Sequence, residues 1–280
     1  MAEFRGASEK SESETISGKY GIKKEILVVK NRSDEEKTGL KQGRYVTLNR
    51  KNVYAESDDE KIYFERCAAK AIRDEIDRLN VKEDYTALVL GLGNGYMTAD
   101  ALGKRVCDGI LTTRKNCAEG LEKVKKVCAF AVGVSGVTGI EGIEAAKGIA
   151  GEIKPDFAIC VDSLCAFRTD RIGRSYQISS VGLAAGSGAG KGAGKIFDKQ
   201  SLGVPVIAVG VPFVISARRL VYDVSLGKNG FDPLSPEEDM FVTFRDADAI
   251  LKECSSVLSA AINLALQPEF GINDVFALTD

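Results

Sequence analysis

The stretch VLGLGNGYMTADALGKRV, residues 89–106, runs from an apolar strand through a glycine turn into an amphipathic helix. This order is typical of the first half of a βαβ unit. Asp100 stands at the start of the helix, where a carboxylate complements the helix dipole. For a single acid that structural role is a sufficient explanation, so the stretch indicates the fold and leaves the role of Asp100 open.

Apolar segments alternate with helical patterns along most of the chain, and this alternation predicts a mostly parallel sheet covered on both faces. Strands are expected at 86–92, 127–134, 156–162 and 204–211, with an extra strand at 175–179. Helices are expected at 57–80, 99–113, 138–154, 217–224 and 246–266. The predicted fold class is therefore α/β, a doubly wound three-layer α/β/α body.

The N-terminal region has a different character. Residues 1–55 are expected to form a polar tail to about residue 17 and then a β-rich extension with strands at 20–30 and 43–49. Residues 56–280 are expected to form the α/β domain. The glycine-rich run at 182–195 predicts a loop.

Charge and cysteine usage limit the classes of partner. Lys and Arg total 38 against 40 Asp and Glu, so no strong net field favours direct binding to nucleic acid or to a membrane. The seven Cys form no CxxC pair, the N-terminus is too polar for a signal peptide, and no segment approaches the roughly 20 apolar residues of a membrane span. We therefore expect a cytoplasmic protein.

The sequence contains no His. Ser–His–Asp triads, Cys–His dyads and the usual zinc sites all need an imidazole, so these site types are excluded in their ordinary form. Two nucleotide-binding motifs also fail: Tyr96 stands where GxGxxG needs its third glycine, and Ala185 and Ala189 stand where a Walker A motif needs its first. No metal or cofactor is expected.

Acids at strand ends are the remaining candidates. Asp162 ends the predicted strand 156–162, and Asp100 follows the strand 86–92 and its loop, so both lie at one sheet edge if these strands are neighbours. Two carboxyl groups a few ångströms apart share one proton near neutral pH. Such a pair can activate water with one member and protonate an amide leaving group with the other. Spacing alone leaves this interpretation open.

An ordered set of motifs resembles the spore germination proteases of endospore-forming bacteria. The blocks are GRYVTL (43–48), GLGNGYMTADALG (91–103), VTGIE (137–141), DSLCAFR (162–168), DR with SYQIS (170–179), AGSGAGK (185–191), LGVPVIAVGVP (202–212) and INLAL (262–266). The set covers residues 43–266 and is more specific than any single motif.

The resemblance implies an atypical aspartic endopeptidase that degrades small acid-soluble spore proteins, with Asp100 and Asp162 as its catalytic aspartates. It also implies a homotetramer, a zymogen that loses an N-terminal propeptide, and a location in the cytoplasm of the forespore or spore core. Residues of the same blocks are expected to bind substrate or support the site: Asn94, Thr138, Glu141, Arg168, Arg171, Ser187 and Lys191. The fold is expected to be similar to that of hydrogenase-maturation endopeptidases, whose nickel site needs a histidine that this chain lacks.

Departures from the family pattern leave a second functional hypothesis open. Ala99 replaces a proline before the first aspartate, and Lys191 replaces an asparagine in the glycine-rich loop. The rival is a catalytically impaired sporulation-related paralogue that binds peptide or protein without hydrolysis. A third hypothesis is a small-molecule amidase that uses the same two acids.

Overall fold

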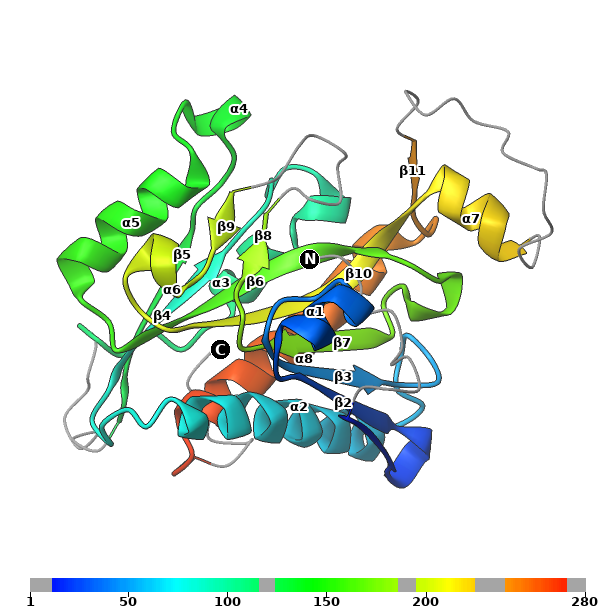
Figure 1. Cartoon of the computed structure of the whole chain (residues 1–280), viewed down its shortest axis with the longest axis horizontal. Helices are drawn as coiled ribbons and strands as arrows, with labels where there is room; N and C mark the ends of the chain where they lie inside the picture. The colour runs from blue at the N-terminus through cyan, green and yellow to red at the C-terminus, as the bar shows by residue number, and fades with distance from the viewer. Residues whose placement is uncertain (1–11, 116–123, 186–194, 225–239, 271–280) are drawn as a thin grey trace.

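The computed structural model describes residues 12–115, 124–185, 195–224 and 240–270 (Figure 1). The strands are β1 Glu12–Ser17, β2 Lys23–Val29, β3 Gly43–Asn49, β4 Thr86–Gly91, β5 Lys126–Ala131, β6 Phe157–Ala166, β7 Ser175–Ser179, β8 Leu183–Ala184, β9 Ile196–Phe197, β10 Val206–Ser216 and β11 Phe241–Val242. The α-helices are α1 Arg32–Thr38, α2 Asp58–Arg78, α3 Leu102–Asp108, α4 Ser135–Thr138, α5 Gly142–Ile153, α6 Lys199–Leu202, α7 Ala217–Val224 and α8 Ala247–Leu266. Short 3₁₀ turns lie at Lys19–Gly21, Thr98–Asp100 and Thr169–Arg171.

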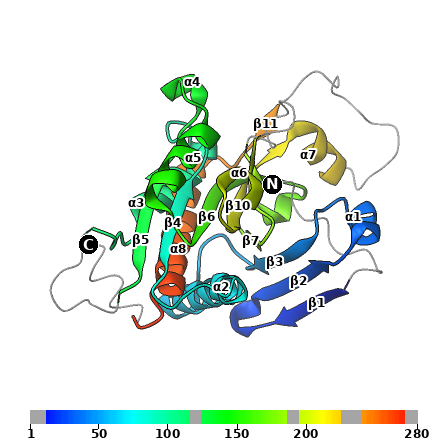
Figure 2. The same cartoon turned by 60° about the vertical axis from the view of Figure 1, so that its left-hand side comes forward.

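The main sheet has nine strands in the order β1-β2-β3-β7-β10-β6-β4-β5, with β11 paired to β10. Strands β10, β6, β4 and β5 run parallel, whereas β1, β2, β3 and β7 continue the sheet with antiparallel pairings. Strands β1 and β5 form its two edges (Figure 2). The chain leaves β4 for β5 on one side and then crosses to β6 on the other, so β4 marks a topological switch point, where α/β sheets commonly bind ligands.

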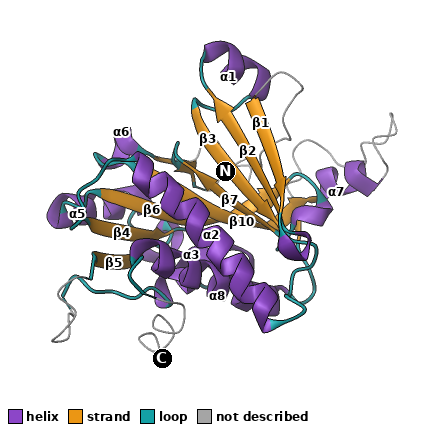
Figure 3. Cartoon of the chain, turned by 90° about the horizontal axis from the view of Figure 1, so that it is seen from below, coloured by secondary structure: helices purple, strands orange, loops and turns teal. Residues whose placement is uncertain are grey.

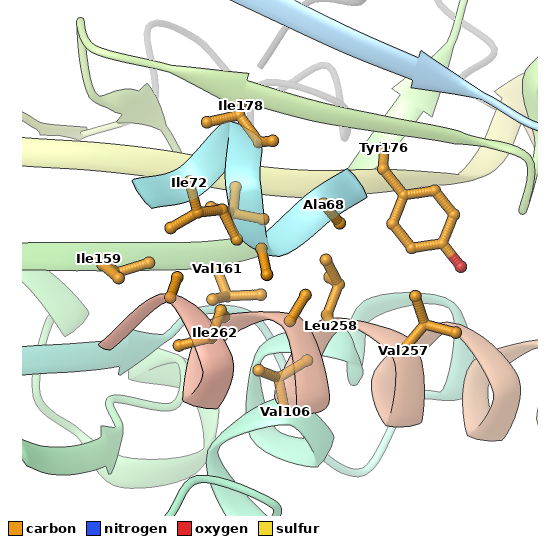
Figure 4. Packing of buried hydrophobic residues seen from close by; sticks show 14 of the residues in the cluster. Ala68, Ile72, Val106, Ile159, Val161, Tyr176, Ile178, Val257, Leu258 and Ile262 are labelled. Carbon is orange, nitrogen blue, oxygen red and sulfur yellow. The ribbon is translucent and has the colours of Figure 1, made fainter. Parts of the chain in front are cut away.

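Helices cover both faces of the sheet and make three layers. Helices α2, α3 and α8 cross one face (Figure 3). The core between them and the sheet includes Val161, Tyr176 and Ile178 (Figure 4). A second apolar cluster joins α5 and α6 to the opposite face. The predicted α/β fold class is confirmed.

Helix α8 corrects one expectation. Its 20 residues are apolar enough to cross a membrane by length and composition, whereas no segment of that kind is expected from the sequence. It packs against α2 and α3 and most of it is buried inside the protein, so it is a core helix. Its apolar side chains face the sheet and two neighbouring helices, and burial on several sides explains its high hydropathy.

The predicted strands and long helices are present with shifted ends. The helix predicted from the Ser57 and Glu60 pattern is α2, in which the Ser57 side chain accepts a hydrogen bond from the Glu60 backbone N–H. The helix expected at 99–113 is a 3₁₀ turn followed by the short α3. The helix expected at 138–154 is α5, which begins at Gly142 after the short α4.

The N-terminal expectations are corrected in two places. The predicted tail to residue 17 contains β1, which pairs along its full length with β2, and the polar segment 31–42 contains α1. The N-terminal strands join the same sheet as the α/β body through β3 and β7. The predicted boundary near residue 55 falls between β3 and α2 and stays a prediction. The predicted loop 182–195 has its ends paired as β8 and β9, and residues 186–194 lie outside the described part.

Candidate active site

Asp100 is held by the turn that follows β4. The Asn94 backbone N–H donates to Asp100 Oδ2 at 2.6 Å, and the Asn94 side chain in turn accepts from the Tyr96 backbone N–H at 3.0 Å. Gly93 has a φ of +92° and lies against the Asp100 carboxyl group, because an added Cβ would come within 2.7 Å of Oδ1. Glycine is therefore required both for the backbone conformation and for the close contact. The predicted supporting role of Asn94 fits this geometry.

Asp162 lies in β6 just past the end of the neighbouring strand β4. The last residue of β4, Gly91, pairs with Val161, so Asp162 is the first residue of β6 beyond that pairing. On the other side Asp162 pairs with Gly210 of β10. Its side chain is buried, with 4% of the residue exposed. A carboxyl group at this depth needs a proton or a partner.

The two carboxyl groups interact. Burial, together with the charge of Asp100, raises the pKa of Asp162 to about 7. Burial also raises the pKa of Asp100, while the hydrogen bond from Asn94 opposes that rise. Asp162 therefore keeps its proton up to near-neutral pH. This is the protonation state in which one acid can act as base and the other as acid.

Two glycines bring helix α3 against the sheet and so fix the turn that carries Asp100. A Cβ on Gly103 would lie 2.3 Å from Leu92 N and 2.7 Å from Val161 O, and a Cβ on Gly91 would lie 2.2 Å from Gly103 O. All three contacts are with backbone atoms, which have little room to move. The sequence GLG…ALG thus encodes a close helix–strand approach.

Sequence reasoning missed Thr98 and Asp248. Thr98 Oγ1 donates to Asp248 Oδ1 at 2.7 Å and so ties the turn containing Asp100 to the first turn of α8. The two residues lie 150 positions apart. An acid in the first turn of a helix is ordinarily read as a dipole effect, so no sequence signal separated Asp248 from that role.

Loss of this tie should reduce activity without unfolding the protein. We expect Thr98→Val to lower kcat about tenfold, since a hydrogen bond to a carboxylate contributes roughly 1.5 kcal/mol, and Thr98→Ser to restore it. Steady-state kinetics on both variants measures the effect. Asn52→Ala is the control, because it removes an exposed hydrogen bond, from Asn52 to Glu56 at 2.8 Å, that involves neither aspartate. Equal losses in Thr98→Val and Asn52→Ala would contradict the role given to Thr98.

Two predicted site residues, Thr138 and Glu141, have structural contacts in the turn between α4 and α5. Thr138 Oγ1 donates to the backbone oxygens of Val134 and Ile140, at 3.2 and 2.9 Å. Glu141 caps α5 through a reciprocal capping box with Glu144. Glu141 also pairs with Lys195 at 3.5 Å. These contacts account for both side chains locally, and their predicted roles toward substrate stay predictions.

The other predicted residues lie after β6 or outside the described part. Arg168 makes a two-point ion pair with Asp170, with nitrogen–oxygen distances of 3.1 and 2.9 Å. Arg171 approaches Glu25 of β2 at 3.9 Å. Ser187 and Lys191 lie outside the described residues. The structure therefore brings Asn94, Asp100 and Asp162 together and gives the two arginines ion pairs of their own.

Fold and site together define an α/β protein whose candidate active site is a pair of coupled carboxyl groups at the switch point of its sheet. Residues 6–226 match the family model described as germination protease. The chain belongs to the germination protease family, and it is a protease.

Individual relatives agree with this assignment. The germination protease of Clostridium tetani is 31% identical over 288 residues, which cover 91% of this chain and 88% of that protein. The germination protease of Caldanaerobacter subterraneus subsp. tengcongensis is 33% identical over 285 residues, covering 90% and 86%. That of Bacillus subtilis is 36% identical over 195 residues, covering 67% and 52%.

A solved structure, the [NiFe] hydrogenase maturation protease HycI of Thermococcus kodakarensis, aligns with 69% of this chain and 98% of its own. The TM-score is 0.34 and the sequences are 14% identical, which is too low to support a conclusion.

Proposed function

We propose that this chain is an aspartic endopeptidase in which Asp100 and Asp162 activate water to attack a peptide carbonyl. The observation that carries the proposal is the placement of two acids at one sheet edge: buried Asp162 lies just past the end of β4, and the turn after β4 holds Asp100. Burial and the neighbouring Asp100 charge raise the pKa of Asp162 to about 7, which fits this placement. Ionised Asp100 would take a proton from water, and protonated Asp162 would donate one to the carbonyl oxygen or the leaving amine. No covalent intermediate is needed.

The proposed substrates are small acid-soluble spore proteins, and the proposed setting is a homotetramer in the cytoplasm of the forespore or spore core, made as a zymogen. Family membership supports these proposals. Digestion of a purified spore protein of this class by the purified chain, followed by mass spectrometry of the fragments, tests them. Discrete cleavage sites that disappear in Asp100→Asn would support the endopeptidase. Turnover of short amides alone would favour a small-molecule amidase.

If the chain is instead a non-catalytic paralogue, it should bind the spore protein stably and produce no fragments between pH 5 and 8. The presence of both aspartates, the turn that holds Asp100 and the raised pKa values favour the enzyme. None of these features is needed for binding alone, and a buried carboxyl pair destabilises a protein that does not use it.

The pH dependence of activity follows from the two pKa values. We expect kcat/KM to fall above about pH 7, because Asp162 then loses the proton that it donates. We expect it to fall again in acid, because Asp100 must be ionised to act as base. Initial rates between pH 4 and 9 measure this bell-shaped profile. The chain contains no histidine, so a fall in rate near pH 7 cannot come from titration of an imidazole. A rate that keeps rising to pH 9 would contradict the assignment of Asp162 as the acid.

A further inference from the structure

Gln177 lies at the centre of β7, in line with the candidate site. It pairs with Gly210 of β10, and Gly210 pairs with Asp162 of β6. The three residues are therefore side by side across three adjacent strands. Neighbouring strands lie about 4.8 Å apart, so the backbones of Gln177 and Asp162 are about 10 Å apart.

The side chains of Gln177 and Asp162 leave the same face of the sheet. Tyr176 and Ile178 pack into the core beneath α2 and α8 (Figure 4), so Gln177 between them points to the opposite face. Val161 packs into the same core, so Asp162 also points away from it. Gly210 between them contributes no side chain.

The amide nitrogen of Gln177 lacks a hydrogen-bond acceptor. Gln177 is 3% exposed, and its buried Nε2 has no partner among the residues that the structure describes. The other two polar side chains on this face of β7 are satisfied: Ser175 donates to Asn49, and Ser179 accepts from the Val181 backbone N–H. A buried polar group without a partner in a folded protein calls for an explanation, and a ligand is one.

On the β10 side, the side chain next to Gln177 offers no acceptor. A Cβ on Gly210 would come 2.7 Å from Leu164 Cγ, so an apolar side chain lies against the glycine between Gln177 and Asp162. On the other side Gln177 pairs with Thr47 of β3, and no hydrogen bond joins the two side chains. Gln177 and Asp162 thus lie on one face of the sheet, with the Leu164 side chain over the glycine between them.

We propose that Gln177 is a substrate-binding residue whose amide N–H donates to a backbone carbonyl of the bound peptide. This inference rests on the proposed endopeptidase function and deepens it. An extended peptide advances about 3.3 Å per residue, so the contacted carbonyl is about three residues from the bond cleaved at Asp162. Gln177 would thus set how long a peptide must be for efficient cleavage.

The test uses Gln177→Met, which keeps the size of the side chain and removes the donor. With a synthetic peptide spanning a cleavage site mapped in a small acid-soluble spore protein, we expect KM to rise about tenfold, the equivalent of one hydrogen bond, and kcat to change less than about twofold. The pH profile should not move. Shortening the peptide at either end should locate a residue, about three from the cleaved bond, whose removal raises KM in the wild type and not in Gln177→Met.

Ser179→Ala is the matched control, since it removes a polar group from the same face of β7 whose hydrogen bond is internal. Its KM should match that of the wild type. If Gln177→Met folds poorly, Gln177→Leu serves as the second variant, and a thermal melt shows which of the two is folded.

Binding separates this inference from the proposed function. In the Asp162→Asn background the same peptide should bind, and adding Gln177→Met should raise Kd about tenfold. If the wild type binds the peptide without cleaving it, the endopeptidase proposal fails. The Gln177 contact is then tested by Kd alone, which should still rise in Gln177→Met. Unchanged Kd and KM in Gln177→Met would overturn the inference. A loss of kcat with a shifted pH profile would also overturn it, because Gln177 would then act on Asp162.

Discussion

Asp162→Asn should lose at least about a thousandfold in kcat and become more stable at pH 8. The loss follows from removal of the acid of the pair, since a positioned general acid or base contributes roughly 10²–10⁴ in rate. The gain in stability follows from burial. Ionising a side chain that is 4% exposed opposes folding, and an amide of the same shape has no charge to bury.

The sign of the pH dependence is fixed by the direction of the shift. Asp162 has a pKa of about 7 in the folded protein, above its ordinary value of 3.8. Below about pH 4 Asp162 is protonated in both the folded and the unfolded protein and costs no stability. As pH rises through 7 the free energy of unfolding falls, because the unfolded chain gives up this proton more readily than the folded one. The advantage of Asp162→Asn should therefore be absent in acid, grow between pH 4 and 7, and level off at roughly 4 kcal/mol. Urea unfolding across this range measures it.

Glu65 offers a matched control for this prediction. Burial raises its pKa to about 7 as well. Glu65 lies on α2, and the charges that act on it are those of Lys61, Glu253 and Arg50, so neither aspartate is involved. Glu65→Gln should show the same pH-dependent gain in stability with unchanged activity. If both variants lose activity, the loss in Asp162→Asn reflects general disturbance of the core. If Asp162→Asn is inactive and equally stable at every pH, the buried pair does not have the pKa assigned to it.

Gly103→Ala should destabilise the protein by about 3 kcal/mol or more and abolish activity. The new methyl group would meet the backbone of Leu92 and Val161 at 2.3 to 2.7 Å, so α3 must move away from β4 and β6. That movement shifts the turn that carries Asp100. Thermal melting should show a fall in Tm of about 10 °C for a chain of this size.

Gly148→Ala is the control for the glycine prediction. Gly148 lies in α5 with no atom within 4 Å of an added Cβ, so alanine should stabilise the helix by about 0.5–1 kcal/mol and leave activity unchanged. A Gly103→Ala variant that melts with the wild type and cleaves normally would show that the close approach of α3 is unnecessary.

Much of the fold could be predicted from the sequence because each buried strand is a short apolar run bounded by turns. Strand β4 and helix α8 were expected within a few residues of their positions. Strand β1 could not be predicted, because its sequence ESETIS is polar and its strand form comes from pairing with β2. Pairing partners far along the chain leave no local pattern.

Some residues of the candidate site could be predicted from the sequence and others could not. Asp100 and Asp162 could be proposed from their places after apolar strands, and the structure gives the reason that they interact: β4 and β6 are neighbours. Thr98 with Asp248, and Gln177 with Gly210, could not be paired from sequence, because only strand order and register bring them together.

An NMR titration of the Asp162 carboxyl carbon, in the wild type and in Asp100→Asn, measures the interaction of the two carboxyl groups itself. We expect a pKa near 7 for Asp162 in the wild type and a lower pKa in the variant, still above the ordinary value because Asp162 stays buried. An Asp162 that titrates in its ordinary range, or whose titration is unaffected by loss of the Asp100 charge, would contradict the shared-proton pair on which the proposed function rests.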